Sequence, residues 1–354
     1  MKSYIILEDG AIFEGASRGK EKTGCGPVVF YTGVVGYQEA ITDPANAGKI
    51  VLLTYPLIGN YGTNPLFNES ARSHTAGVVI KEDSHIYSNW QAKGSFNDFL
   101  ERERLACISE VDTRTLMVDI RNKKEPWALI STGSVKRKAA VKKIAQRKKE
   151  KTSYLKDVSV DKLRQINTGS PRIVIIDLGI CGSFVNQLKS LGPELWLAPY
   201  NITASELLKL NPAGIIVSSG PEEDPQIDVV VKTVKEVLGK VPLLGIASGL
   251  QVIGRALGGR ISKLGAGHHG LNYPVMAEDT HKGEITSQNH SYVVDEDSLK
   301  GITDVRVAER NLHDHTVEKI ISEQLRMIAI QYYPASPGFG QPHPIFSDFL
   351  NMVR

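Results

Sequence analysis

The sequence predicts an α/β protein in which an N-terminal β-rich domain is followed by a doubly wound domain with a parallel sheet. A chain of 354 residues is long enough for two domains that each bury a core. The composition, 41% hydrophobic and 23% charged with 32 glycines, is typical of a globular α/β protein and excludes global disorder. The hydrophobic pattern also changes near residue 171, from short β-like runs to strands that alternate with amphipathic helices.

Charge and cysteine content narrow the classes of function. A formal net charge of +3 is too small to favour nucleic-acid or membrane binding, so we expect protein or small-molecule partners. Cys25, Cys107 and Cys181 are odd in number and widely spaced, which fits neither a disulfide framework nor a metal site. No window approaches the roughly 18 apolar residues of a membrane span, and the N-terminal apolar run is too short for a signal segment. We therefore expect a soluble, cytoplasmic protein without a metal or a cofactor.

Residues 1–150 are expected to form the β-rich domain. They carry β-branched and aromatic runs broken by glycine turns, among them YIILEDGAIFEG and KIVLLTYPLIGNYG. Between Lys136 and Lys151, nine of sixteen positions are Lys or Arg, with a thin apolar stripe that includes Ala140 and Ile144. This pattern predicts a solvated surface helix rather than a nucleic-acid site. A linker is expected over 151–170, where the turn-forming residues TGSP precede a new apolar run.

Residues 171–354 repeat a pattern of strand, turn and helix. The strands include IVIIDLGI, GIIVSSGP and VPLLGIASG, and amphipathic helices lie between them. This alternation predicts a mostly parallel sheet with helices on both faces. Ligands of such sheets bind at the carboxyl ends of the strands. The turns after Ile176, Val217 and Ile246 are therefore the candidate site.

The stretch VPLLGIASGLQVIGRALGG, residues 241–259, has the layout of a turn that carries a catalytic nucleophile. A buried strand over 241–244 leads into Gly245 and Gly249, and we expect a helix to begin near Gln251. Enzymes hold a Cys or Ser on such a bend, where backbone N–H groups face the developing oxyanion. The central residue here is Ala247, which has no nucleophilic atom.

Other reactive groups fit the pattern less well. Ser248 follows the central position, so its side chain is expected to point elsewhere on the bend. Cys181 is expected to be a small buried hydrophobic residue. Only His313 and His315 have the spacing of a His-x-His pair. Such a pair without a third ligand is weak evidence for a metal. We expect loop and turn positions for the histidines, namely His268, His269, His290, His313 and His315.

Longer motifs extend over nearly the whole chain. The first domain contains LEDGAIFEG, TGVVGYQEAITDPANAGKIVLLTYPLIGNYG and VDTRTL, and the second contains SSGPEEDP, GHHGLNYPV, ITSQNHSYVVDEDSL and IQYYPASPG. In these motifs the chain resembles the small, glutaminase subunit of carbamoyl phosphate synthetase, whose second domain is a class I glutamine amidotransferase. The resemblance implies glutamine hydrolysis by a Cys-His-Glu triad and transfer of ammonia to a large, ATP-using subunit. It also implies a product used in arginine or pyrimidine biosynthesis.

The catalytic positions that the resemblance implies are all changed. The family elbow GICLGHQ corresponds here to 245–251, with Ala247 in place of the Cys. The family segment QYHPE has Tyr333 in place of the His and Ala335 in place of the Glu. A methyl group cannot form a thioester, and a phenol with a pKa near 10 cannot activate a thiol at neutral pH. We therefore predict that the chain has no catalytic residue.

The glutamine-binding positions that the resemblance implies have changed in parallel. The loop SGPGDP of the family carries a Glu and a one-residue insertion here, and we expect Glu222 and Glu223 to repel the α-carboxylate of the substrate. A family Ser is Ala45, and a family Gly is Ser291. The vestigial glutamine pocket is predicted to comprise Ala45, Gly220, Glu222, Ser248, Gln251, Asn289, Ser291 and Tyr292.

These observations favour a small subunit with an inactive glutaminase site, which acts as a structural or regulatory partner of an ammonia-using large subunit in a hetero-oligomer. One alternative is an enzyme with residual or altered amide-hydrolysing activity. A further alternative is a stand-alone ligand-binding module. Because the segments TYPLIGNYG and VDTRTL are retained, we favour the first interpretation.

Overall fold

The computed structural model describes residues 1–19, 23–133, 136–338 and 340–353. It divides into two compact units. The barrel unit is Met1–Thr152 with Gly265–His269, and the sheet unit is Ser153–Leu264 with Gly270–Arg354. The segment 151–170, for which a linker is predicted, contains α5 (Leu155–Val158) and β10 (Arg164–Asn167). The boundaries predicted at residues 150 and 171 remain predictions.

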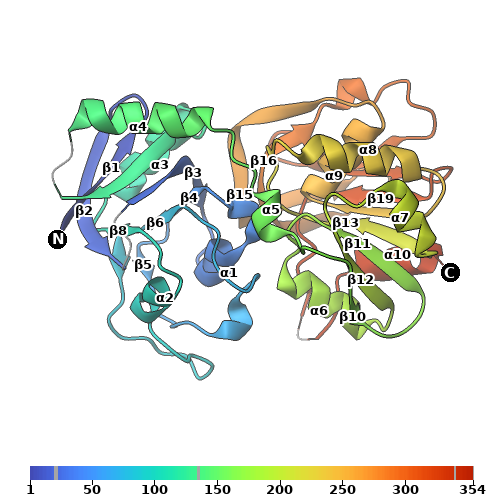
Figure 1. Cartoon of the computed structure of the whole chain (residues 1–354), viewed down its shortest axis with the longest axis horizontal. Coiled ribbons are helices and arrows are strands. Elements are labelled where there is room, and N and C mark those ends of the chain that lie inside the picture. Colours follow the sequence, from blue (N-terminus) through green and yellow to red (C-terminus); the bar gives the residue numbers. More distant parts are fainter. Residues whose placement is uncertain (20–22, 134–135, 339, 354) are drawn as a thin grey trace. The chain divides into compact units, whose positions relative to one another are not determined.

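The barrel unit is built on a closed β-barrel, which confirms the β-rich prediction (Figure 1). The order of its strands is β1-β2-β8-β6-β4-β3-β9, and β1 closes the ring by pairing antiparallel with β9. Closure leaves no free strand edge for another chain to extend. The barrel strands are β1 (Lys2–Leu7), β2 (Ile12–Arg18), β3 (Thr23–Tyr31), β4 (Ile50–Leu53), β6 (Gly77–Val79), β8 (Cys107–Ser109) and β9 (Trp127–Thr132).

Short helices and a small ladder complete the barrel unit. They are α1 (Tyr37–Thr42), α2 (Phe96–Arg102), α3 (Thr113–Asn122), α4 (Arg137–Lys149), the 3₁₀ helices η1 (Pro44–Asn46) and η2 (Pro65–Phe67), and the paired strands β5 (Leu57–Ile58) and β7 (Glu82–Asp83). The basic helix α4 lies on the barrel through Ala140 and Ile144, which pack with Ile6 and Leu129. Its lysines face solvent, as the sequence predicted for a surface helix.

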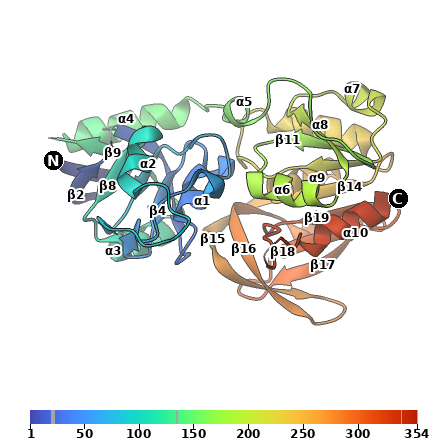
Figure 2. The same ribbon diagram turned by 90° about the horizontal axis from the view of Figure 1, so that it is seen from below.

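The sheet unit contains one long mixed sheet, in the order β10-β12-β11-β13-β14-β19-β18-β17-β15-β16. Its parallel part confirms the predicted fold class and comprises β11 (Arg172–Asp177), β12 (Glu194–Pro199), β13 (Gly214–Val217), β14 (Leu243–Ile246) and β19 (Met327–Ile330). An antiparallel part follows, with β15 (Ile261–Ala277), β16 (Gly283–Val294), β17 (Arg306–Asn311) and β18 (Val317–Ser322) (Figure 2). The sequence interpretation did not foresee this part, whose short connections suit antiparallel pairing.

Helices cover both faces of the parallel strands (Figure 1). One face packs against α7 (Ala204–Lys209), α8 (Ile227–Val237) and α9 (Ser248–Ala256), and the other packs against α6 (Gly182–Ser190) and α10 (Pro344–Val353). Successive side chains of β11 alternate between the two cores, with Val174 and Ile176 in one and Ile173 and Ile175 in the other. Both faces of the strand are therefore apolar, which explains its continuous hydrophobic run.

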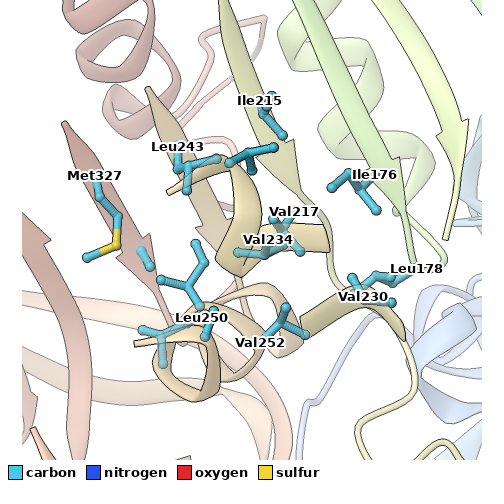
Figure 3. Packing of buried hydrophobic residues seen from close by; sticks show 14 of the residues in the cluster. Ile176, Leu178, Ile215, Val217, Val230, Val234, Leu243, Leu250, Val252 and Met327 are labelled. Carbon is cyan, nitrogen blue, oxygen red and sulfur yellow. The ribbon is translucent and has the colours of Figure 1, made fainter. Parts of the chain in front are cut away.

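The core between the strands and α8 and α9 is made of interlocking aliphatic side chains (Figure 3). Leu250 of α9 lies in it with Val217 of β13 and Leu243 of β14, and each of these side chains is fully buried. This packing fixes the first turn of α9 at the carboxyl end of β14, where the candidate site was predicted. None of the helices in the described ranges is long and apolar enough to cross a membrane.

Candidate functional site

The bend after β14 has the backbone of a nucleophile elbow, although its central residue is an alanine. Ala247 has φ 53° and ψ −111°, a conformation that L-residues rarely adopt, and it is the N-cap of α9. Its N–H donates to the carbonyl of Ile330 over 2.8 Å, which fixes the bend to the neighbouring strand. Helix α9 begins at Ser248, so the expectation that it begins near Gln251 was wrong. The bend is sharper than predicted because Ala247 alone makes the turn from strand to helix.

Glycine is required where α9 approaches the sheet. A Cβ on Gly249 would lie 2.0 Å from the carbonyl oxygen of Val217, far inside van der Waals contact. A Cβ on Gly220, in the loop after β13, would lie 1.9 Å from the carbonyl oxygen of Leu178. Both glycines therefore hold backbone segments close together at the carboxyl edge of the strands.

The other two residues predicted to stand at triad positions, Tyr333 and Ala335, follow β19 (Met327–Ile330). The Tyr333 ring packs edge-on against Phe184 with 5.3 Å between ring centroids, and its hydroxyl oxygen accepts a hydrogen bond of 3.4 Å from the Asn289 amide. Ala247 and Tyr333 contribute to the same apolar cluster. Ala335 is exposed. The three positions thus supply a methyl group, a phenol and a second methyl group, none of which is a thiol, imidazole or carboxylate.

Glu222 was expected to repel a substrate carboxylate, but its own carboxylate is bound by N–H donors of the chain. One of its carboxylate oxygens accepts hydrogen bonds from the Gln251 amide (2.7 Å) and the Tyr292 backbone N–H (3.2 Å). The other accepts from the Ser291 backbone N–H over 2.8 Å. Loop, helix α9 and strand β16 therefore meet at this carboxylate, whereas the neighbouring Glu223 is exposed.

The remaining predicted pocket residues make other contacts. Ser248 is buried, and its Oγ lies 3.5 Å from the carbonyl oxygen of Ser218. Asn289 donates to the Tyr333 hydroxyl. Ala45 belongs to the barrel unit, where it lies in η1 and its N–H donates to the Asp43 carboxylate over 2.9 Å.

Family models match both halves of the chain. The model described as carbamoyl-phosphate synthase small chain, CPSase domain, matches residues 5–130. The model described as glutamine amidotransferase class-I matches residues 174–352. The carbamoyl phosphate synthase small chain of Caldanaerobacter subterraneus is 38% identical over 354 residues, which cover 100% of this chain and 97% of that relative.

This chain belongs to the carbamoyl phosphate synthase small chain family.

A second family member, from Archaeoglobus fulgidus, is 36% identical over 362 residues, covering 100% of this chain and 99% of its own length. Among solved structures, a glutamine amidotransferase from Thermotoga maritima aligns with a TM-score of 0.36 at 14% identity, over 46% of this chain and 75% of its own. The full-length sequence relatives alone show the family of this chain.

Two further candidate nucleophiles in this small chain are buried. Cys181 is 1% exposed at the N-cap of α6, with its Sγ 4.0 Å from the Ser219 hydroxyl, as expected for a small buried hydrophobic residue. Ser248 is 2% exposed. Reactive cysteines and serines lie where a substrate can reach them, so burial argues against either side chain as a nucleophile.

The expectation of loop positions for the histidines was correct for His313 and His315, which lie in the turn between β17 and β18. It was wrong for His268, His269 and His290, which are buried strand residues. The rings of the last two are held by side-chain partners: His269 by Glu125, and His290 by Gln288. Residues 267–270 are all buried and the next two are exposed, so the motif GHHGLNY has no alternation of inward and outward residues that could have placed it in a strand.

The sequence interpretation also missed two buried carboxylates that order the loops of the sheet unit. Asp224 accepts hydrogen bonds from the backbone N–H groups of Tyr154 and Leu155, which fixes the start of α5. Asp177, at the end of β11, accepts from the N–H groups of Gly179 and Ile180. Burial raises the pKa of the Asp177 carboxyl, while these N–H donors oppose that rise. The available signal for Asp177 was an Asp at the end of an apolar strand, and for Asp224 it was an Asp before a proline in a loop.

Proposed function

We propose that this chain is the small subunit of a carbamoyl phosphate synthase whose glutaminase site is inactive, and that it supports a large subunit that uses free ammonia. The observation that carries the proposal is the elbow itself. It keeps the bend, the helix N-terminus and the close-packed glycines of a nucleophile turn, and it presents the methyl group of Ala247. The proposed role is therefore structural or regulatory and not hydrolytic.

Loss of the base and of its orienting carboxylate supports the same proposal. The Tyr333 hydroxyl interacts with Asn289, and Ala335 cannot orient a base. The members of a catalytic triad act together, so removing the nucleophile or the base alone costs about as much as removing all three members. Covalent hydrolysis of an amide would therefore need changes at several positions of this chain.

Residual amide hydrolysis by a displaced nucleophile is the competing proposal. Ser248 and Cys181 are the nearest candidates in sequence, and both are buried in apolar or backbone surroundings. We favour the inactive site because a substrate amide has little access to side chains as buried as these, and buried structural cysteines are inert.

The proposed partner is the large subunit that the words "small chain" imply, in a hetero-oligomer. The retained first-domain motifs support this role, and so do large apolar side chains on the surface of the barrel unit. Leu66, Ile86 and Trp90 are 84%, 82% and 90% exposed. Exposed apolar groups that gather on one surface are typical of interfaces. In this proposal the complex acts in the cytoplasm and serves arginine or pyrimidine biosynthesis.

Release of ammonia from glutamine by the purified chain tests the inactive site. We expect none above a buffer blank. Ala247→Cys should be equally inactive, because a thiol without base and carboxylate lacks the cooperative effect of the triad. The triple variant Ala247→Cys, Tyr333→His, Ala335→Glu serves as the matched comparison, since it restores all three groups of the predicted triad. Ammonia release by the unmodified chain that disappears in Ser248→Ala or Cys181→Ala would contradict the proposal.

A further inference from the structure

The carboxylate of Glu222 lies in a set of N–H donors that come from elsewhere in the chain. We name this set the carboxylate cradle and define it as the backbone N–H groups of Ser291 and Tyr292 and the side-chain amide of Gln251. Their distances to the carboxylate oxygens are 2.8, 3.2 and 2.7 Å. Hydrogen bonds to an ionised acceptor are about twice as strong as those between neutral groups.

The cradle is formed by buried and mutually supported groups. Gln251 is 5% exposed, and its amide also donates to the Tyr292 carbonyl over 3.0 Å, which fixes its orientation. Ser291 is 3% exposed. In a regular strand, successive N–H groups point to opposite sides. Here two successive N–H groups of β16 donate to one carboxylate, so the backbone is locally shaped to hold a single anion.

The cradle lies beside the elbow. Gln251 is on the first turn of α9, and its backbone N–H approaches the Ala247 carbonyl at 3.4 Å. Every residue of the cradle, and Glu222 itself, is among the positions predicted for the vestigial glutamine pocket. A free amino acid carries the same carboxylate group as the Glu222 side chain.

We propose that Glu222 is a built-in ligand of the carboxylate cradle, which excludes the carboxylate of a free amino acid from this pocket. The inference rests on the proposed function, because it names a further reason why glutamine is not used. Direct occupation replaces the expectation that Glu222 and Glu223 repel the α-carboxylate of the substrate as like charges at close range. Glu223 is exposed and has no part in the cradle.

Occupation by a tethered group weakens binding of a free ligand in a predictable way. The apparent affinity falls in proportion to the fraction of molecules in which the site is open. A group on the same chain competes at a high effective concentration, which dissolved ligand reaches only with difficulty. If the cradle is filled in nine of ten molecules, the apparent Kd rises about tenfold.

The test is calorimetric titration of L-glutamine into four forms of the full chain: unmodified, Glu222→Gly, Glu222→Gln and Glu223→Gly. We expect Glu222→Gly to bind L-glutamine at least about tenfold more tightly than the unmodified chain does, as follows if the cradle is filled in nine of ten unmodified molecules. Glu222→Gln should also bind L-glutamine more tightly than the unmodified chain does, because the NH₂ group of the new side chain faces N–H donors and makes it a weaker occupant of the cradle. Its side chain has nearly the size of the original one, so the loop is disturbed less than in Glu222→Gly. Glu223→Gly is the matched control on the adjacent residue and should bind as the unmodified chain does. Adding Gln251→Ala to Glu222→Gly should abolish the gain.

Each outcome decides the inference. Equal affinity of Glu222→Gly and the unmodified chain would overturn it, provided that circular dichroism shows both to be folded. If Glu222→Gly is unfolded, the comparison of Glu222→Gln with the unmodified chain decides in the same way. A gain of the same size in Glu223→Gly would also overturn it, since loosening of the loop would then be the cause. Because binding is read without turnover, the inference can fail while the site remains inactive. Ammonia release by the unmodified chain would instead overturn the proposed function.

Discussion

At the scale of the residue, the backbone of Ala247 is strained although its side chain carries no nucleophilic atom. A conformation such as that of Ala247 costs about 1–3 kcal/mol and persists only where the surroundings enforce it. Here the surroundings are the hydrogen bond to Ile330 and the close approach of Gly249 to β13. Packing of the sheet unit therefore maintains the bend, whether or not it carries a nucleophile.

Ala247→Gly tests this account, because glycine adopts positive φ without strain. Relief of about 1–3 kcal/mol offsets the loss of one buried methyl group, worth about 0.8 kcal/mol. We expect the free energy of unfolding in urea to stay unchanged or to rise. Ala256→Gly in the same helix is the control, and it should lower the free energy of unfolding by about 1–2 kcal/mol. Equal destabilisation by the two changes would show that Ala247 is not strained.

At the scale of the element, α4 shows how few residues hold a strongly basic helix in place. Seven of its thirteen residues are Lys or Arg, nearly all of them exposed, and its buried residues are Ala140 and Ile144. They pack with Ile6 and Leu129 on the outside of the barrel. Isolated helices of this length are only marginally stable in water, so packing must supply the stability of α4.

Ile144→Ala should therefore lower the free energy of unfolding of the chain by about 2–4 kcal/mol, since Ile144 is 1% exposed. Lys142→Ala, on the exposed side of the same helix, should change it by no more than about 0.5 kcal/mol. Urea denaturation followed by circular dichroism measures both. A larger effect at Lys142 than at Ile144 would mean that charge, and not apolar packing, holds the helix.

Elements with an uninterrupted hydrophobic or charge pattern could be predicted from the sequence. The apolar runs of β11, β13 and β14 and the basic pattern of α4 identified a parallel sheet and a surface helix. The antiparallel strands β15–β18 were harder, because their faces mix apolar with buried polar residues such as His290 and Glu318. The inactive site was predicted from residue types at motif positions and stays a prediction. The cradle could not, since the contact between Glu222 and Ser291 joins residues 69 positions apart.

At the scale of the whole molecule, the proposed role depends on a partner surface on the barrel unit. We name as the apolar loop pair the segments 59–66 and 84–94, which lie side by side: Lys93 N–H donates to the Thr63 carbonyl over 2.8 Å, and the Asn64 amide donates to the Gln91 carbonyl over 2.6 Å. This pair carries the exposed side chain of Trp90. Tryptophan is enriched among the residues that dominate binding energy at interfaces.

Trp90→Ala should therefore weaken association with the large subunit by about 2 kcal/mol, roughly a thirtyfold rise in Kd at 25 °C. Ile285→Ala is the control, because Ile285 is 64% exposed but belongs to the sheet unit. Surface-immobilised large subunit and soluble small-chain variants would provide the affinities. An unchanged Kd for Trp90→Ala, or an equal rise for Ile285→Ala, would place the principal contact elsewhere.

The choice of nitrogen donor tests the central claim most directly. The chain and its large subunit are reconstituted, and carbamoyl phosphate is measured with saturating ammonium chloride or with saturating glutamine. Production of ammonia from glutamine requires a nucleophile at the elbow, and Ala247, Tyr333 and Ala335 supply neither nucleophile nor base. We predict synthesis from ammonium chloride and none from glutamine. Equal rates with the two donors would contradict the inactive site, and no product from either would favour a stand-alone binding module.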